Sequence, residues 1–151
     1  MNLKLIVDYG EGTKYKGELL HDAPHGKGTL IAADGGNYTG DFRYGKFDGH
    51  GTLNQPDGAR YTGQFKNGLF NGQGELIKPG ISTYKGEFKD GVMHGQGKHM
   101  EPDGLIWDGC FFEGEMIGSG ILTLPTGEVV EGCFDKGKFT IEKVLKDGKQ
   151  T

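Results

Sequence analysis

Residues 61–76 read YTGQFKNGLFNGQGEL, and this stretch decides the fold of the 151-residue chain. Two sets of positions alternate with period two within it: first Tyr61, Gly63 and Phe65, then Gly72, Gly74 and Leu76. Side chains alternate in this way along a β-strand, where successive residues point to opposite faces of the sheet. Gly68 separates the two halves at the place of a tight turn. The stretch is therefore predicted to form a β-hairpin.

The same pattern recurs along the chain with a period of 23 residues, as in the step from Tyr38 to Tyr61. The leading position of each copy is held by Tyr15, Tyr38, Tyr61, Tyr84, Trp107 and Val130. We therefore expect one repeat array over residues 1–151, with a partial cap at 1–14, repeats starting at residues 15, 38, 61, 84 and 107, and a degenerate copy or cap at 130–151. Ile141 and Lys143 replace the Gly-x-Gly pair there, as expected of a terminal strand. The conformation of residues 143–151 is left open.

The composition indicates a single layer of strands. The chain contains 30 glycines, and they lie beside Tyr, Phe and Leu in the repeats. A ring can lie over the bare backbone of a glycine on a neighbouring strand and so bury its area within one layer. No segment has the period of an amphipathic helix that could cover the sheet. The predicted fold is all-β: a single-layer antiparallel meander of hairpin repeats, forming an elongated, twisted and curled rod.

Alternation along the strands gives the sheet an aromatic face and a polar face. Because a long exposed apolar stripe is typical of an interaction surface, we predict that a helical or extended segment of a partner binds along it. The residues predicted to line this groove are Tyr38, Phe42, Tyr61, Phe65, Tyr84, Phe88, Trp107 and Phe111. The alternative interpretation is that the rings serve only to hold the layer together.

The pattern Tyr-x-Gly-x-Phe-x-x-Gly-x-x-x-Gly-x-Gly-x-Leu, complete from Tyr61 to Leu76, resembles the MORN repeat, and the resemblance covers nearly the whole chain. It implies a non-catalytic scaffold or adaptor that binds partner proteins along its groove. The resemblance also implies cytoskeletal, ciliary or membrane-junction sites of action, and it implies phospholipid binding.

A second interaction site is predicted in the acidic part of the chain. Residues 101–135 hold eight Asp or Glu and no Lys or Arg. Phe112 stands where earlier copies have Arg43, Lys66 and Lys89, so it places an aromatic ring on the polar face. The site residues are Phe112, Asp108, Glu113 and Glu115. Apolar anchors among carboxylates would suit a basic amphipathic partner, whereas the alternative is a charged end that only keeps the protein in solution.

Membrane binding is the alternative function. Anionic lipids such as phosphoinositides attract Lys and Arg, and the candidate contacts are Lys14, Lys16, Lys27, Lys85, Lys89 and the basic tail from Lys136. The acidic residues 101–135 would oppose close approach to such a surface. Self-association is a further expectation, because the ends of an open sheet present unpaired backbone groups.

Catalysis, metal binding and nucleic-acid binding are not expected. The five histidines form no ligand cluster in a strand arrangement, and no set of residues with the roles of nucleophile, base and acid converges. The net charge is −4 with no basic stripe, which argues against nucleic acid. Cys110 and Cys133 occupy equivalent strand positions, too far apart for a disulfide. Two unpaired cysteines, no apolar span and no signal peptide before Asp8 predict a cytoplasmic protein without cofactors.

Overall fold

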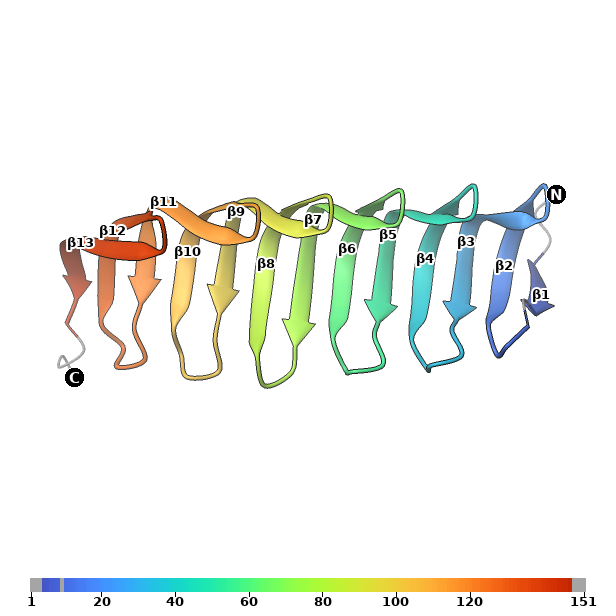
Figure 1. The fold of residues 1–151 in the computed structure, drawn as a ribbon, viewed down its shortest axis with the longest axis horizontal. Helices are drawn as coiled ribbons and strands as arrows, with labels where there is room; N and C mark the ends of the chain where they lie inside the picture. Colours follow the sequence, from blue (N-terminus) through green and yellow to red (C-terminus); the bar gives the residue numbers. More distant parts are fainter. Residues whose placement is uncertain (1–3, 9, 148–151) are drawn as a thin grey trace.

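The computed structural model describes residues 4–8 and 10–147, and these form one open sheet of thirteen antiparallel strands in sequence order (Figure 1). The strands are β1 (Lys4–Asp8), β2 (Lys14–Leu20), β3 (Ala23–Ile31), β4 (Asn37–Arg43), β5 (Lys46–Asn54), β6 (Arg60–Lys66), β7 (Leu69–Lys78), β8 (Ser82–Lys89), β9 (Val92–Met100), β10 (Ile106–Phe112), β11 (Glu115–Thr123), β12 (Val129–Asp135) and β13 (Lys138–Lys146). The predicted single-layer meander is confirmed. Residues 143–146, whose conformation the sequence left open, belong to β13, and residues 148–151 lie outside the described part.

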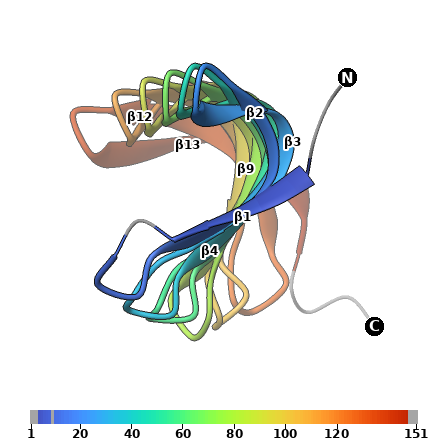
Figure 2. The same ribbon diagram turned by 90° about the vertical axis from the view of Figure 1, so that its right-hand side faces the viewer.

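The sheet is curled across its width, so that the rod has a C-shaped cross-section when viewed along its axis (Figure 2). The two edges of the C carry the two kinds of turn. Tight turns such as Tyr44-Gly45, which join β4 to β5, form the upper rim in Figure 1. Longer loops such as the one between β5 and β6 form the lower rim. A trough open to one side therefore runs along the whole array.

A bulge in each hairpin explains the curl. In the second repeat, Gly40 pairs with Gly51 and Phe42 pairs with Phe47, so three residues of β5 lie opposite Asp41 alone. Gly49, inside this bulge, has φ +102°, a conformation that side-chain-bearing residues rarely adopt. Bulges bend the strand that contains them and increase its twist. The bulge recurs in the five hairpins from β2–β3 to β10–β11, whereas β12–β13 has smaller shifts of register. These five hairpins therefore bend at about the same height, and the sheet curls into a trough.

The leading ring of each repeat is held in place by a hydrogen bond to its own strand. Tyr61 Oη donates to the carbonyl of Gln64 at 2.6 Å, and its ring stacks on Phe70 with centroids 3.8 Å apart. The first, second and fourth repeats make the same hydroxyl-to-carbonyl bond, and in the fifth repeat Trp107 Nε1 donates to the carbonyl of Cys110 at 3.2 Å. Each tyrosine ring can therefore be buried without leaving its hydroxyl group unpaired.

Glycines make room for these rings. A Cβ built on Gly74 would lie 2.5 Å from Cζ of Tyr61, and corresponding contacts occur between Gly51 and Tyr38 and between Gly97 and Tyr84. In the last hairpin the ring of Phe139 covers Gly132 in the same manner. One row of the buried core is thus formed by rings lying over glycine backbone, with Tyr15, Tyr38, Tyr61, Tyr84 and Trp107 at most 2% exposed. The buried rings of Phe42, Phe65, Phe88 and Phe111 form a second row beside it.

Successive repeats are tied together at the upper rim as well as by strand pairing. Gly68 N, in the turn of the third repeat, donates to the carbonyl of Phe47 in the second repeat at 2.8 Å. The neighbouring Asn67 N donates to Asp48 Oδ2 at 3.1 Å. Asp90 N makes the equivalent bond to Asn71 Oδ1 one repeat later. The position of Asp48 and Asn71 therefore supplies a side-chain acceptor that fixes the next turn.

The loop at the end of the third repeat differs from the others. Its glycine, Gly80, stands one place earlier than Gly58 and Gly104 in the equivalent loops, which predicts a different turn. Ile81 N donates to the carbonyl of Lys78 there. In the second repeat the loop is instead closed by Gln55 N donating to the carbonyl of Ala59, with Gly58 N donating back to Gln55.

The tight turn between β2 and β3 lacks the glycine that the later tight turns have, and a glycine there is expected to stabilise the protein. His21 and Asp22 have φ +50° and +64°, whereas the later tight turns have Gly in the second place. Left-handed backbone costs an L-residue about 1 kcal/mol. Asp22→Gly should therefore raise the urea midpoint and add about 1 kcal/mol to the free energy of unfolding.

Asp34→Gly is the matched control for this change. Asp34 also lies in a turn, but its Oδ1 accepts a hydrogen bond from Gly36 N at 2.9 Å. Its replacement should lower the urea midpoint. Equal shifts of the same sign in both variants would show that the positive φ at Asp22 costs nothing.

Candidate functional site

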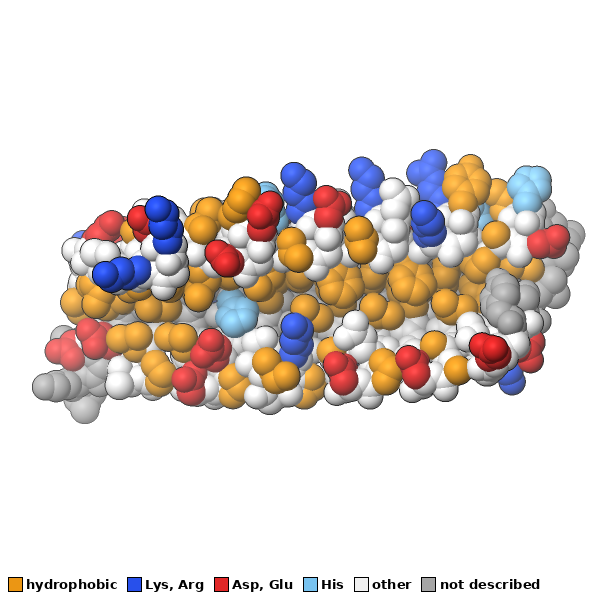
Figure 3. Space-filling view, viewed as in Figure 1, with side chains coloured by type: hydrophobic (Ala, Val, Ile, Leu, Met, Phe, Trp, Pro, Cys, Tyr) orange, Lys and Arg blue, Asp and Glu red, His pale blue; other side chains and the backbone are white. Residues whose placement is uncertain are grey.

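The inner face of the trough carries an unbroken apolar band. Figure 3 looks into the opening and shows hydrophobic side chains along the middle, with charged groups gathered on both rims. One wall of this inner groove is a row of partly buried side chains, Phe47, Phe70, Met93, Met116 and Phe139. The opposite wall is the row Leu30, Leu53, Leu76 and His99. These two rows are the apolar surface that a molecule in the groove would touch.

The eight residues predicted to line the groove lie beneath this surface. Tyr38, Phe42, Tyr61, Phe65, Tyr84, Phe88, Trp107 and Phe111 are brought into one continuous cluster, and each is at most 4% exposed. They contact one another edge to face, as Tyr61 does with Phe65 at 4.9 Å and with Phe88 at 5.2 Å. So little of these rings is accessible that they form the packed floor of the groove, and a molecule in the groove would touch the two rows above them instead.

The groove widens into a cavity of about 390 Å³ in the C-terminal half of the array. Its lining combines Met93 and Met116 with Phe111, Phe134 and His99. Glu115 and Lys136 contribute from the upper rim. Two changes in the repeat create this space: methionine replaces the ring of Phe47 and Phe70, and His99 replaces leucine. Methionine adapts its shape easily, so the cavity can accommodate side chains of different outline.

His99 is the polar group within this apolar cavity. Partial burial lowers the pKa of His99 below its ordinary value, the nearby Lys78 lowers it further, and Glu101 acts in the opposite direction. The neutral imidazole is therefore the favoured form near pH 7, and it can donate or accept one hydrogen bond inside the groove.

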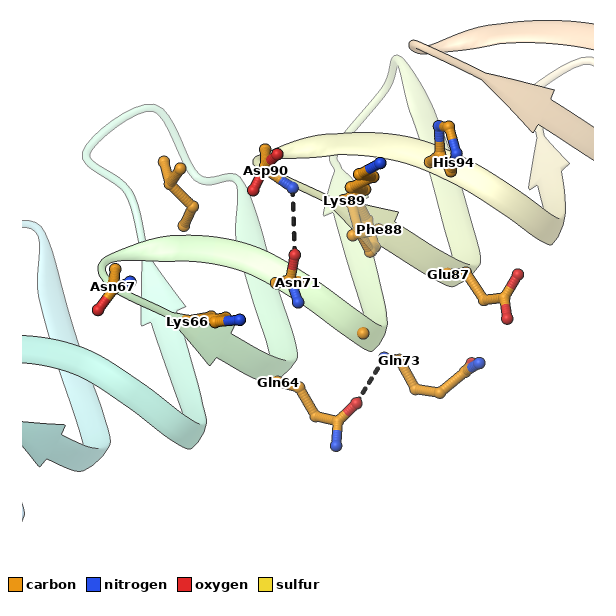
Figure 4. Close-up of a pocket in the computed structure, with 12 residues that line it drawn as sticks. Gln64, Lys66, Asn67, Asn71, Gln73, Glu87, Phe88, Lys89, Asp90 and His94 are labelled. Atoms are coloured by element: carbon orange, nitrogen blue, oxygen red, sulfur yellow. Dashed lines mark hydrogen bonds between the residues drawn. The ribbon is translucent and has the colours of Figure 1, made fainter.

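The outer face has open polar notches between successive hairpins. The notch of about 880 Å³ between the third and fourth repeats is drawn in Figure 4. Within it Gln73 N donates to Gln64 Oε1 at 2.7 Å, and Asp90 N donates to Asn71 Oδ1. A similar notch of about 750 Å³ lies one repeat earlier. The notches thus arise from the repeat geometry, and their hydrogen-bonding groups serve the scaffold.

The predicted second site lies at the fifth repeat. Phe112 and Asp108 are exposed residues of β10 on the outer face, Glu113 lies in the tight turn, and Glu115 begins β11 opposite Phe112. Phe112 is 51% exposed, and the ring of His94 lies 5.3 Å from it. The structure therefore brings Phe112, Glu113 and Glu115 together at the upper rim but leaves Asp108 further down β10, opposite Ile121. The role of the four residues in binding stays a prediction.

The lysines predicted to contact lipid do not form one cluster. Lys14, Lys16, Lys27, Lys85 and Lys89 are exposed but are distributed over β2, β3 and β8. Lys27 Nζ forms an ion pair with Asp41 on β4. Burial raises the pKa of Asp41, but the hydrogen bonds from Lys27 and from the backbone of His50 outweigh it and hold the pKa below its ordinary value.

The part of the chain that the structure describes contains no group of three or more His, Cys, Asp or Glu side chains arranged to hold a metal ion. None of the residues described forms a helix long and apolar enough to cross a bilayer. Cys110 and Cys133 are both free thiols.

With this geometry established, comparison with protein-family models finds the MORN repeat at residues 15–37, 38–60, 61–80, 84–105 and 107–129. The chain belongs to the MORN-repeat family. Each matched segment begins at the leading ring of its repeat, which is Tyr15, Tyr38, Tyr61, Tyr84 or Trp107. MORN repeats are interaction modules for proteins or membranes. A comparison of the chain with curated proteins finds no match.

Sequence reasoning missed the row of Phe47, Phe70, Met93, Met116 and Phe139, which the structure places above the leading rings. The signal was available, because these residues also recur every 23 positions. It was obscured by the bulge, which changes the alternation between the tight turn and the Gly-x-Gly pair.

Proposed function

We propose that this MORN-repeat protein is a non-catalytic scaffold whose inner groove binds a helical or extended segment of a partner protein. The observation that carries the proposal is the continuous apolar band between two charged rims, with a cavity of about 390 Å³ set into it (Figure 3). Exposed apolar surface of this extent is typical of an interaction site. An amphipathic segment could bury its apolar side in the trough and leave its polar side in water.

The shape of the groove supports a segment over a small molecule. One row runs from Phe47 on β5 to Phe139 on β13 and the other from Leu30 on β3 to His99 on β9, so contacts repeat at the spacing of the hairpins, about 10 Å. The buried rings beneath hold the groove open without the partner, because their positions are fixed by stacking and by hydroxyl-to-carbonyl bonds. A preformed groove reduces the ordering cost of binding. The cavity at Met93 and Met116 would then receive the largest apolar side chain of the segment.

The test uses peptides selected from a phage-displayed library of random 16-residue sequences against the intact protein. Met93→Lys should weaken the selected peptides at least tenfold, because a charge placed in the apolar groove is desolvated when the peptide covers it. Met93 is only partly buried, so this change tests binding, whereas a change at buried Phe65 would test folding. Affinities are measured by fluorescence anisotropy, with circular dichroism confirming that each variant is folded.

Val92→Lys is the matched control, because Val92 is the preceding residue of β9, points to the other side of the sheet and is 44% exposed. It should leave the affinity within about twofold. Equal losses in both variants, or no loss in either, would contradict groove binding. In parallel, flotation with phosphoinositide-containing liposomes tests the membrane alternative, for which the scattered lysines and the acidic fifth repeat give little support.

A further inference from the structure

The outer face of the sheet changes character at the fifth repeat. On β4 to β9 the residues that point outward are mostly polar, as in Thr52, Gln64 and Glu87. On β10 to β12 the outward positions hold a group that we name the outer patch: Cys110, Phe112, Ile117, Ile121 and Cys133. Alternation fixes their direction, because Phe112 follows buried Phe111 and Ile121 precedes buried Leu122. An exposed apolar surface therefore lies on the opposite side of the sheet from the inner groove.

The register brings these side chains together. Cys110 pairs with Ile117 between β10 and β11, and Ser119 pairs with Cys133 between β11 and β12. Phe112 is 51% exposed, Ile121 40% and Ile117 36%. Cys110, Phe112 and Ile117 thus lie together on β10 and β11, and Ile121 and Cys133 lie next to Ser119 on the same face.

In the fifth repeat, residues of the outer patch replace side chains that accept structural hydrogen bonds in earlier copies. The position of Ile117 is occupied in earlier copies by His25, Asp48, Asn71 and His94. The first three accept the N–H of the next tight turn, whereas the ring of His94 lies beside Phe112. An isoleucine side chain has no atom that can accept it. The loss of this acceptor does not stabilise the array, and departures from a local structural rule are expected at functional sites.

Cys110 makes a second exchange of the same kind. The equivalent Asp41, Gln64 and Glu87 each accept the backbone N–H between the two glycines of the bulge, at 2.6 to 2.9 Å. A thiol is a much weaker acceptor than a carboxylate or an amide oxygen. Two independent positions of one repeat therefore exchange scaffold hydrogen bonds for apolar surface.

Acidic residues surround the outer patch. Ile121 pairs with Asp108 on one side and with Glu131 on the other. Glu113 and Glu115 lie at the turn beside Phe112, and Asp135 ends β12. Residues 101–135 contain no Lys or Arg, but cations face them from both neighbouring strands. Lys98 on β9 pairs with Asp108, and Lys143 and Lys138 on β13 pair with Glu131 and Asp135. The negative charge is therefore concentrated at Glu113 and Glu115 beside Phe112, where it attracts cations and repels anionic lipid surfaces.

We infer that the outer patch is a second docking site, independent of the inner groove, for a basic amphipathic segment of a partner protein. The apolar side of the segment covers Phe112, Ile117 and Ile121, and its Lys or Arg residues face the surrounding carboxylates. Carboxylates at the border of such a site steer the encounter, and the central apolar contacts hold the complex. With the groove on the other face, the sheet can then hold two partners back to back.

The probe is a fluorescein-labelled 14-residue amphipathic helical peptide made of Leu and Lys, with the same peptide carrying Glu for Lys as its control. The test variant is Phe112→Lys with Ile121→Thr, which restores the residues of earlier copies, Lys66 and Thr52, and is therefore compatible with the fold. The Leu/Lys peptide should bind the intact protein and lose at least tenfold in affinity to the double variant. Its binding should weaken between 50 and 300 mM NaCl, and the Leu/Glu peptide should not bind.

Thiol protection locates the bound peptide, because the two cysteines of the chain, Cys110 and Cys133, both lie in the outer patch. The peptide should slow the reaction of both thiols with Ellman's reagent. Met93→Lys should leave the affinity within about threefold. No binding, equal binding to the double variant, or unprotected thiols would overturn the inference. Loss of binding in Met93→Lys alone would place the peptide in the groove, and concentration-dependent dimers of the intact protein that the double variant lacks would assign the patch to self-association.

Discussion

Gly74→Ala is expected to lower the free energy of unfolding by about 3 kcal/mol, the upper end of what overpacking a well-filled core costs. The added Cβ would lie 2.5 Å from Cζ and 2.6 Å from Cε2 of Tyr61. That ring has no free direction of movement, because it stacks on Phe70 and its hydroxyl is bonded to the carbonyl of Gln64. The methyl group must therefore displace the ring or separate β6 from β7. Urea denaturation followed by circular dichroism measures the loss.

Gly80→Ala is the control for this prediction. A Cβ on Gly80 meets no atom within 4 Å, but φ is +73°. Its replacement should cost about 1 kcal/mol, from the left-handed backbone alone. A loss at Gly74 no larger than that at Gly80 would show that the ring does not rest on the glycine backbone, and the single-layer core would need another explanation.

Raising the pH from 10 to 12 is expected to unfold the protein. Burial raises the pKa of Tyr61 to about 12, and burial together with the charge of Glu87 raises the pKa of Tyr84 to about 12. Burial, assisted by Asp41, also raises the pKa of Tyr38. An unfolded chain ionises its tyrosines near pH 10. The stabilisation from keeping these phenols neutral is fully present below pH 10 and is lost as the pH rises through 12.

The size of this effect follows from proton linkage. Each pKa unit corresponds to about 1.4 kcal/mol, so Tyr61 and Tyr84 together remove roughly 5 kcal/mol between pH 10 and pH 12. Circular dichroism at fixed temperature reports the sheet, and absorbance at 295 nm reports phenolate. The two signals should change together. In Tyr61→Phe the free energy of unfolding should fall less steeply with pH, because one titrating phenol has been removed. Ionised phenols within an intact sheet at pH 11 would contradict the burial of the rings.

The strands and their order could be predicted from the sequence because the pattern of one hairpin recurs in six copies. Tyr-x-Gly-x-Phe fixes one strand and Gly-x-Gly-x-Leu the next, and the missing turn glycine at Asp22 identifies the exceptional turn. Even the altered loop at Lys78 could be anticipated, since a glycine moved by one place changes which residue takes positive φ.

The contact surface of the groove could not be predicted in the same way. Alternation assigns Tyr61 and Phe70 to faces, but it does not state which ring lies on top. That order depends on the bulge, which brings Phe70 back over Tyr61, and on the bond from Tyr61 to Gln64, which holds the lower ring flat. The eight predicted groove residues lie on the inner face but are buried beneath the row that contains Phe70. The second site was predicted from the break in the repeat at Phe112, whereas the place of Ile121 relative to Asp108 and Glu131 required the register.

The strict sequence order of the sheet means that each strand pairs only with its neighbours in the chain. The length of the array can therefore change without changing the packing within it. One further 23-residue unit would add two strands, or about 10 Å, at one end. The distance between a ligand in the N-terminal part of the trough and one seated at the far end would grow by the same increment. If the trough binds partner segments as proposed, the number of repeats would set the distance between two of them.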